Sequence, residues 1–297
     1  MFHHEALLYD GPDEFLAGTL PFIREGFERG EPVLIALAPE KLDAVGDALG
    51  ASDAEFVDMR VLGHNPARII PAWRDFQARH DGPVRGIGEP IWAERSGAEL
   101  VECQLHEALL NVAFNGADEF KLLCPYDTSV LDDSVIHEAC AGHPHVDAQP
   151  SRAYRGPERL LAPFESPLEP PPAHARVLGF ELDTLAEVRR VTEGCVADLE
   201  HPRGQDLVLA VAELAANSIR HGGGRGILRV WHDDGSVIAE IRDRGRIEDP
   251  LAGRHEPGLE QLGGRGLWIA NAVCDLVQVR SGRQGTAIRL HMKPSTS

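Results

Sequence analysis

The hydrophobic positions of residues 1 to about 150 follow two alternating patterns. Short continuous apolar runs, of which "PVLIALA" is the clearest, predict strands that are buried on both faces. Between these runs, apolar residues recur at helical spacing, which is typical of helices that pack on a core through one face. The predicted strands are residues 5–10, 32–38, 55–59, 83–89 and 120–127, and the predicted helices are residues 12–30, 41–50, 66–80 and 98–114. This alternation predicts a layered α/β domain.

The pattern from residue 175 onward predicts a different architecture. A strand at 176–182 precedes two helices, 183–199 with Asp183 as its cap and 206–221. Residues 225–245 form two strands around an Asp-Gly turn, which is a strong hairpin signal. A third helix at 264–275 and a second hairpin at 276–293 complete the order β-α-α-β-β-α-β-β. This order predicts helices on one face of a largely antiparallel sheet, an α+β two-layer sandwich.

A proline-rich segment separates the two patterns. Proline removes a backbone donor and disfavours both helix and sheet, so the segment is expected to be an extended, semi-rigid linker. The chain is therefore expected to consist of a domain at 1–150, a linker at 151–174 and a second domain at 175–297. The prolines are Pro150, Pro157, Pro163, Pro167, Pro170, Pro171 and Pro172.

The charge and cysteine content narrow the function classes. The formal net charge is −18, which argues against direct binding of nucleic acid or of an anionic membrane. It suits a basic protein partner, or it serves solubility alone. The five cysteines form no C-x-x-C pair, which is typical of free thiols in a reducing cytoplasm. The chain opens with no signal peptide and has no apolar run long enough to span a membrane, so a cytoplasmic location is expected.

The stretch "ELAANSIRHGGG" carries the first candidate chemistry. Glu213 and Asn217 lie four residues apart, so they are neighbours on one flank of the predicted helix. An amide oxygen suits a hydrated Mg²⁺ ion, and a carboxylate can orient or deprotonate an attacking group. The alternative is an ordinary solvated helix flank. The three glycines that follow let the chain turn back into the sheet.

Three further stretches carry the remaining candidates. In "IRDRGR", Asp243 ends a strand and Gly245 follows it, so a carboxylate there can accept an exocyclic amine while the backbone passes close to a flat ring. In "GGRGLWIANAVCD", glycines precede a helix, and free amides at a helix N-terminus bind phosphate. In "GTAIRL", Thr286 opens the last strand. The polar residues 247–261 form a candidate lid. Each stretch has a structural alternative: a strand end, a loop before a helix, or a β-branched strand residue.

The order and spacing of these motifs resemble the ATP-binding fold of the GHKL superfamily, which includes gyrase, MutL and the histidine kinases. The motifs are most similar to the RsbW-like anti-sigma-factor serine kinases of bacteria, over about residues 175–293. The resemblance implies ATP and Mg²⁺ as cofactors, with Asn217 binding Mg²⁺ and Glu213 as the base-like catalytic residue. It also implies nucleotide contacts from a further set: Asp243 at the adenine amino group, Gly245 beside the ring, Gly264, Arg265, Gly266 and Leu267 at the phosphates, and Thr286 near the adenine.

Residues 1–150 resemble the MEDS sensory domain. The matching stretches are "HEALLYDGPDEFLAGTLPFIREGFERGEPVLIALAPEKL", "GEPIW", "LLCPYD" and "HPHV". The resemblance implies a RecA-like three-layer core. The chain contains no G-x-x-x-x-G-K-[ST] phosphate loop, so Lys41 alone predicts no second ATPase, and a ligand-binding or docking domain is expected instead.

Two histidine-rich stretches contain residue types that can bind a metal ion. "HEACAGHPHV" holds His137, Cys140, His143 and His145, and helical spacing would bring His137 and Cys140 together. Pro144 interrupts this stretch, and the other candidate, His3 and His4, lies beside a chain end that usually frays. The sequence therefore favours no metal in either stretch.

The sequence leaves three functions open for the second domain. It is a protein serine kinase that phosphorylates an anti-anti-sigma (STAS) partner in a stress response and/or sequesters a sigma factor, or it is a nucleotide-gated binding switch without turnover. The third is a ligand-only sensor whose ATP site is relict. A histidine-kinase-type sensor is disfavoured, because the segment before the domain is rich in proline rather than a helical hairpin with a phosphoacceptor histidine. The resemblance is compatible with a homodimer, since RsbW-like proteins often pair, but the sequence does not fix the oligomeric state. In each case the first domain is expected to sense the signal that controls the second domain.

Overall fold

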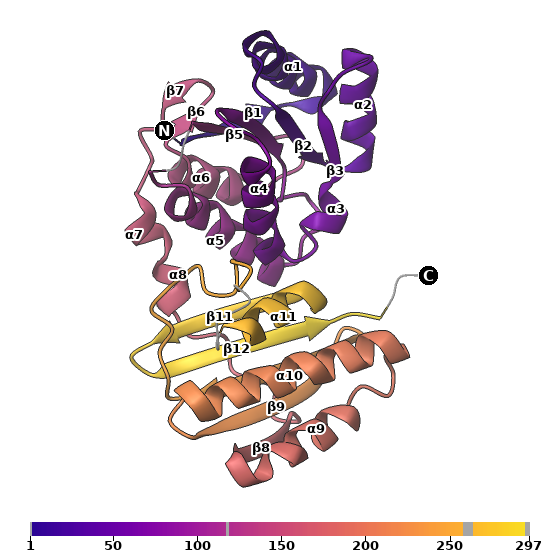
Figure 1. Ribbon diagram of the computed structural model, residues 1–297, viewed down its shortest axis with the longest axis vertical. Coiled ribbons are helices and arrows are strands. Elements are labelled where there is room, and N and C mark those ends of the chain that lie inside the picture. The colour runs from indigo at the N-terminus through magenta and orange to yellow at the C-terminus, as the bar shows by residue number, and fades with distance from the viewer. Residues whose placement is uncertain (1, 117–118, 258–263, 295–297) are drawn as a thin grey trace. The chain divides into compact units, whose positions relative to one another are not determined.

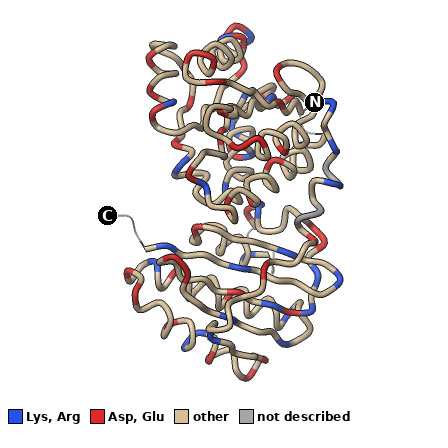
Figure 2. Tube along the Cα trace, turned by 180° about the vertical axis from the view of Figure 1, so that it is seen from behind, with Lys and Arg blue, Asp and Glu red and all other residues tan. Residues whose placement is uncertain are grey.

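The computed structural model describes residues 2–116, 119–257 and 264–294 (Figure 1). The chain divides into two compact units, Met1–Leu161 and Ala162–Ser297. Among the described helices, none combines the length and apolar composition that crossing a membrane requires. Acidic side chains are distributed over both units (Figure 2), in keeping with the net charge of −18.

The first unit contains a seven-stranded sheet in the order β3-β2-β4-β5-β1-β6-β7. All its strand pairs are parallel except β6 with β7. The five strands predicted from continuous apolar runs are all present. The strands are β1 (His3–Tyr9), β2 (Val33–Leu37), β3 (Glu55–Asp58), β4 (Val84–Gly88), β5 (Phe120–Asp127), β6 (His145–Val146) and β7 (Gln149–Pro150).

Helices cover both faces of this sheet and so form three layers. On one face, Ile35 and Ile87 pack into a core with Phe15 and Ile23 of α1. On the other, α4 packs so closely that a Cβ added at Gly86 would lie 2.8 Å from the Trp73 ring. The helices are α1 (Gly11–Arg29), α2 (Pro39–Leu49), α3 (Met59–Leu62), α4 (Ile69–Ala78) with the 3-10 turn η1 (Pro66–Arg68) before it, α5 (Gly97–Ala113) and α6 (Asp133–Gly142).

The proline-rich segment differs from the extended linker that was predicted. It contains two short helices, α7 (Pro157–Leu160) and α8 (Ala162–Glu165). Phe164 and Leu168 are buried, and the carbonyl of Glu169 accepts a hydrogen bond from Arg289 of β12 at 2.6 Å. Proline is tolerated in the first turn of a helix, which explains how this composition still forms helical turns. Part of the segment therefore packs against the second unit.

The second unit has a five-stranded antiparallel sheet in the order β11-β12-β10-β9-β8. The predicted order of elements and the α+β sandwich are confirmed, with the helices on one face (Figure 1). The strands are β8 (Arg176–Glu181), β9 (Arg225–Asp233), β10 (Ser236–Asp243), β11 (Leu276–Gly282) and β12 (Gly285–Met292), and the helices are α9 (Leu185–Glu193), α10 (His201–His221) and α11 (Arg265–Val273) with the 3-10 turn η2 (Leu182–Thr184).

Two helix limits differ from the prediction. Asp183 lies within η2, and Thr184 occupies the N-cap position of α9, which ends at Glu193 rather than residue 199. The second helix, α10, begins at His201 rather than residue 206, with a proline in its first turn. Proline is favoured there because its ring already holds the helical φ angle and its missing N–H has no partner to lose.

The face of the second sheet that the helices leave uncovered carries a buried ion cluster. Glu240 is fully buried and pairs with Arg242 and Arg289, each at 2.7 Å. Side chains alternate across a strand, so the neighbours Ala239 and Ile241 point to the opposite face and join the helix-side core. Asp243 of β10 pairs with Thr286 of β12, and both side chains point to the helix-side face, where the pocket described below lies.

Candidate nucleotide pocket

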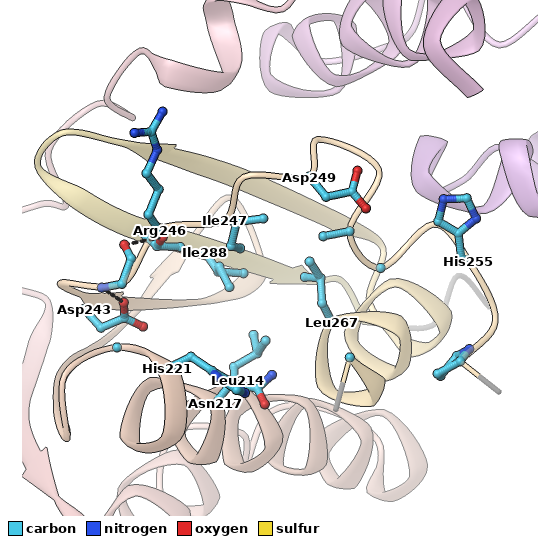
Figure 3. A pocket seen from close by; sticks show the side chains of 17 residues that line it. Leu214, Asn217, His221, Asp243, Arg246, Ile247, Asp249, His255, Leu267 and Ile288 are labelled. Atoms are coloured by element: carbon cyan, nitrogen blue, oxygen red, sulfur yellow. Dashed lines mark hydrogen bonds between the residues drawn. The ribbon is translucent and has the colours of Figure 1, made fainter. Parts of the chain in front are cut away.

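A pocket of about 400 Å³ lies between the helices and the sheet of the second unit (Figure 3). Asp243 and His255 lie toward opposite ends of it, with apolar side chains between them. The lining residues come from α10, the end of β10, the following loop, the start of α11 and β12. They are Leu214, Asn217, His221, Gly222, Asp243, Gly245, Arg246, Ile247, Asp249, Ala252, Gly253, His255, Pro257, Gly264, Leu267, Thr286 and Ile288.

Helix α10 presents one face to the pocket. Leu214, Asn217 and His221 line it at the i, i+3 and i+7 positions, which share a helix face. Glu213, the predicted catalytic residue, is half-buried and is not among the lining residues. The helix ends in the glycines that the sequence placed there: Gly223 and Gly224 have φ angles of 87° and 80°, which turn the chain into β9.

Asp243 is held by two hydrogen bonds. Ser218 of α10 donates its hydroxyl to Oδ2 at 2.6 Å, and the backbone N–H of Gly245 donates to Oδ1 at 2.7 Å. A carboxylate oxygen has two lone pairs, so each oxygen keeps capacity for one more donor. Ser218 is buried, and the sequence analysis missed this contact because it crosses from helix to strand.

Thr286 fixes the loop that follows Asp243. Its hydroxyl donates to the carbonyl of Gly245 at 2.9 Å and lies 2.8 Å from the hydroxyl of Ser281. Ser281 Oγ in turn accepts the backbone N–H of Ile247 at 2.7 Å. This chain of hydrogen bonds ties the loop to β11 and β12, so Asp243 is presented to the pocket by a fixed backbone.

Glycine is required where backbones cross near Asp243. A Cβ added at Gly222 would lie 2.4 Å from the Asp243 carboxyl carbon, and one at Gly245 would lie 2.6 Å from the carbonyl oxygen of His221. Gly285 has a φ angle of 100°, and an added Cβ would lie 2.1 Å from the Asp243 carbonyl oxygen. Any side chain at these positions would displace the carboxylate or the floor of the pocket.

The start of α11 forms another wall. Gly264 is the N-cap residue, with a φ angle of 88°, and it lines the pocket together with Leu267. Gly266 is buried against α10: a Cβ there would lie 2.5 Å from Asn217 Nδ2. Arg265 is exposed, and neither Arg265 nor Gly266 is among the lining residues. Gly266 therefore allows the close packing of α11 on α10.

The candidate lid is described only as far as residue 257; residues 258–261 of it, and Gly263 of the glycine motif, lie outside the described residues. Asp249 accepts the backbone N–H of Leu251 at 2.9 Å, and Asn271 of α11 donates to the carbonyl of Gly253 at 2.9 Å. The Asp249 bond is local to the loop, so the described part is fastened to β11 through Ile247 and to α11 at Gly253. The sequence did not single out Arg246, Asp249 or His255 as pocket residues, because a loop has no periodicity that reveals which side chains turn inward.

The arrangement suits a flat aromatic ring with an amine, followed by an anionic chain. Ile247, Leu267 and Ile288 provide apolar contact area between the two ends, and Asp243 offers acceptor capacity at one of them (Figure 3). The N-terminus of α11 faces this pocket at Gly264, and backbone N–H groups at a helix N-terminus can bind an anion. The amide oxygen of Asn217 is a ligand type that Mg²⁺ accepts. These residues fit a magnesium-bound adenine nucleotide.

Two family models match the chain. Residues 3–144 match MEDS, the methanogen/methylotroph, DcmR sensory domain. Residues 178–292 match the histidine kinase-like ATPase domain. Each match lies within one of the two compact units.

Similar solved structures are distant from this chain. The RsbU and RsbW domains of Rv1364c from Mycobacterium tuberculosis are 21% identical, with a TM-score of 0.31, over 41% of this chain. This chain spans about a third of that structure, 33% of its length. The Acinetobacter baumannii histidine kinase AdeS is 12% identical, with a TM-score of 0.24, over 65% of this chain and 94% of that one. No curated protein matches the chain. On the two family matches, the chain joins a MEDS sensory domain to a histidine kinase-like ATPase domain.

Proposed function

We propose that this protein is an ATP-binding signalling regulator of the anti-sigma type. Its ATPase domain binds Mg-ATP, phosphorylates a serine of an anti-anti-sigma (STAS) partner and sequesters a sigma factor, and the MEDS domain supplies the input. The observation that carries the proposal is the fixed Asp243 carboxylate at one end of a pocket whose other wall is the N-terminus of α11.

The adenine end of the proposed site is built around Asp243. Its spare lone pairs accept the exocyclic amine, while Gly245 lets the backbone approach the ring. Thr286 lies near the base and holds the Gly245 carbonyl in place. A hydrogen bond to an ionised acceptor contributes about 1.5–3 kcal/mol, which favours adenine over a base that presents a carbonyl at that position.

The phosphate end is built from α11 and α10. The amides around Gly264, Arg265 and Gly266 bind the phosphates, with Leu267 packing beneath them. Asn217 would hold Mg²⁺ through its amide oxygen, and the ion would neutralise charge on the phosphates. Transfer of the γ-phosphoryl group then requires the serine hydroxyl to lie in line with it and to lose its proton, the step assigned to Glu213.

Glu213→Gln tests the catalytic assignment. Removing a general base costs about 10²- to 10⁴-fold in rate, so we expect transfer of radiolabelled phosphate from ATP to the STAS partner to fall by that factor while ATP affinity is unchanged. Glu187→Gln, at a half-exposed glutamate of α9, is the matched control and should phosphorylate normally. Normal phosphorylation by Glu213→Gln would remove Glu213 from the mechanism.

One observation favours a second candidate function, a nucleotide-gated binding switch without turnover. Glu213 is not among the lining residues, so a base role would require it to reach the phosphates from the flank of α10. In the switch, ATP and ADP stabilise different states of the domain, and a partner that prefers one state binds with a different affinity. The net charge of −18 complements a basic surface on a sigma factor.

Co-precipitation with a sigma factor separates the two candidates. For the switch we expect the captured amount to differ between ATP and ADP, and the difference to disappear in Asn217→Ala, with no phosphate transferred to a STAS protein. A difference that survives Asn217→Ala would argue against control through this pocket.

A further inference from the structure

We propose that the MEDS unit contains a buried four-ligand site for a divalent transition-metal ion of the Zn²⁺ type, formed by His4, Glu107, Cys124 and His143. All four side chains are buried, and their ligand atoms lie within 4.8 Å of one another. They come from β1, α5, β5 and the residue directly after α6. The site therefore ties together segments more than a hundred residues apart in the chain, such as His4 and Glu107 with a separation of 103.

The distances between the ligand atoms fit a small coordination sphere. His4 Nε2 and His143 Nε2 lie 3.1 Å and 3.3 Å from Glu107 Oε2. Cys124 Sγ lies 3.4 Å from His4 Nε2 and 3.6 Å from Glu107 Oε2. In a tetrahedron with metal–ligand bonds of ~2.0–2.3 Å, neighbouring ligand atoms are roughly 3.3–3.6 Å apart. These four of the six ligand–ligand distances are therefore close to those such a sphere requires, and the two that involve His143 with His4 and Cys124 are at most 4.8 Å.

The hydrogen bonds on the far side of each imidazole fix which nitrogen faces the centre. His143 Nδ1 lies 2.8 Å from the carbonyl of Ala139, which can only accept, so Nδ1 carries the proton. His4 Nδ1 lies 3.1 Å from Asn111 Oδ1. The Asn111 amide group donates to the carbonyls of Glu107 and Gly142, so its oxygen is turned toward His4 as an acceptor. Both Nε2 atoms therefore present lone pairs inward, the arrangement typical of metal-binding histidines.

This arrangement leaves acceptors facing acceptors. Two Nε2 lone pairs converge on an ionised carboxylate oxygen, and the single proton of the Cys124 thiol can satisfy only one of these atoms. Glu107 Oε1 has no hydrogen-bond partner, and within the described part of the chain no Lys or Arg forms an ion pair with Glu107. A buried charge without compensation is costly. A divalent cation at the centre would satisfy all four ligands at once.

The ligand types select the metal. Two imidazoles, a thiolate and a carboxylate suit Zn²⁺ and related ions, whereas Mg²⁺ and Ca²⁺ prefer oxygen ligands alone. Four protein ligands in a closed position are typical of a structural site rather than a catalytic one. His137 and Cys140, which helical spacing suggested as a pair of metal ligands, are not in the cluster. His137 is exposed, and its Nε2 lies 2.8 Å from Nη2 of Arg155.

Metal titration of the full-length chain, prepared without a polyhistidine tag, tests the site. After chelation and dialysis, Co²⁺ should bind at one equivalent and give the intense visible bands of tetrahedral cobalt with a sulfur-to-cobalt charge-transfer band. Zn²⁺ should displace it stoichiometrically. Cys124→Ser should lose the charge-transfer band, and His143→Gln should weaken Co²⁺ binding at least tenfold. Cys140→Ser, at a cysteine outside the cluster, should behave as the parent protein.

Circular dichroism of each metal-free protein shows whether it is folded before titration. Failure of the folded parent protein to bind Co²⁺ or Zn²⁺ at near one equivalent would overturn the proposal. An unchanged cobalt spectrum in Cys124→Ser would also overturn it, because the bound metal would then lie elsewhere. A melting temperature of the parent protein that rises with Zn²⁺, but does not rise in His143→Gln, would support it independently of the spectrum.

Discussion

Asp243→Asn separates the recognition of adenine from the stability of the domain. The carboxylate accepts one hydrogen bond on each oxygen, from Ser218 and from the backbone N–H of Gly245. Asparagine offers one acceptor oxygen, which the Gly245 N–H must take because that group can only donate. The new NH₂ group then faces Ser218, whose hydroxyl can accept this bond and donate to the carbonyl of Leu214 instead, now at 3.3 Å. The fold is therefore expected to lose only about 1 kcal/mol.

Nucleotide binding should change far more. The exocyclic amine of adenine would meet an NH₂ group instead of an ionised acceptor, and the lost charge-assisted hydrogen bond is worth about 1.5–3 kcal/mol. The Kd for ATP should therefore rise roughly 10- to 150-fold. Inosine triphosphate, which presents a carbonyl oxygen at the same ring position, should lose much less affinity, because the asparagine NH₂ group can donate to that oxygen.

Isothermal titration of the parent protein and the variant with ATP and with inosine triphosphate measures both effects. Asp249→Asn is the matched control, since it removes the same charge from the same pocket, and among the described residues the Asp249 carboxylate bonds to Leu251 of its own loop. It should leave the preference for adenine intact. Equal ATP affinity in the parent protein and Asp243→Asn would refute the placement of adenine at this carboxylate.

Three substitutions test the packing that supports the two units. Gly285→Ala should destabilise the ATPase domain by about 2–4 kcal/mol, because the added Cβ would lie 2.1 Å from a backbone oxygen. Gly82 has the same φ angle of 100° but open space around it, so Gly82→Ala should cost only about 1–2 kcal/mol of stability. Thermal unfolding compares the two. Gly86→Ala should cost about 1–3 kcal/mol by urea titration, since the Cβ would lie 2.8 Å from Trp73; a neutral result would contradict the close packing of α4. Thr286→Val should lower the free energy of unfolding by about 1–2 kcal/mol and weaken ATP binding. An unchanged ATP affinity would show that the hydrogen bonds of Thr286 do not support the pocket.

The regular elements were predictable because their signals are local. Continuous apolar runs and helical spacing are properties of a few neighbouring residues, and they located every strand of the two sheets except β6 and β7. The short helix α6 escaped prediction because the residues it buries include Ala139, Ala141 and Gly142, which give little amphipathic contrast. Strands of two residues, such as β6, have no periodicity to detect.

The sequence predicted residues of the pocket only where they belong to a recognised motif. Asn217 and Asp243 were selected from motif order, and the structure brings both to one pocket. Ser218 was not selected, because its partner lies 25 residues away on another element. The same limit hid the cluster around Glu107, whose two histidines belong to stretches that were judged separately and unfavourably for metal binding. Such groupings arise from the sheet order, which the sequence pattern alone does not give.

The packing of the proline-rich segment decides how the ATPase domain can be isolated. A fragment that starts at residue 175 would lack Phe164 and Leu168 and would leave the Arg289 guanidinium without the carbonyl of Glu169. It would uncover the part of β11 on which α8 packs, and we expect it to self-associate at high concentration. A fragment that starts at residue 162 retains this cover and should remain monodisperse in light scattering. The proline-rich segment therefore contributes to the colloidal behaviour of the domain as well as to its connection.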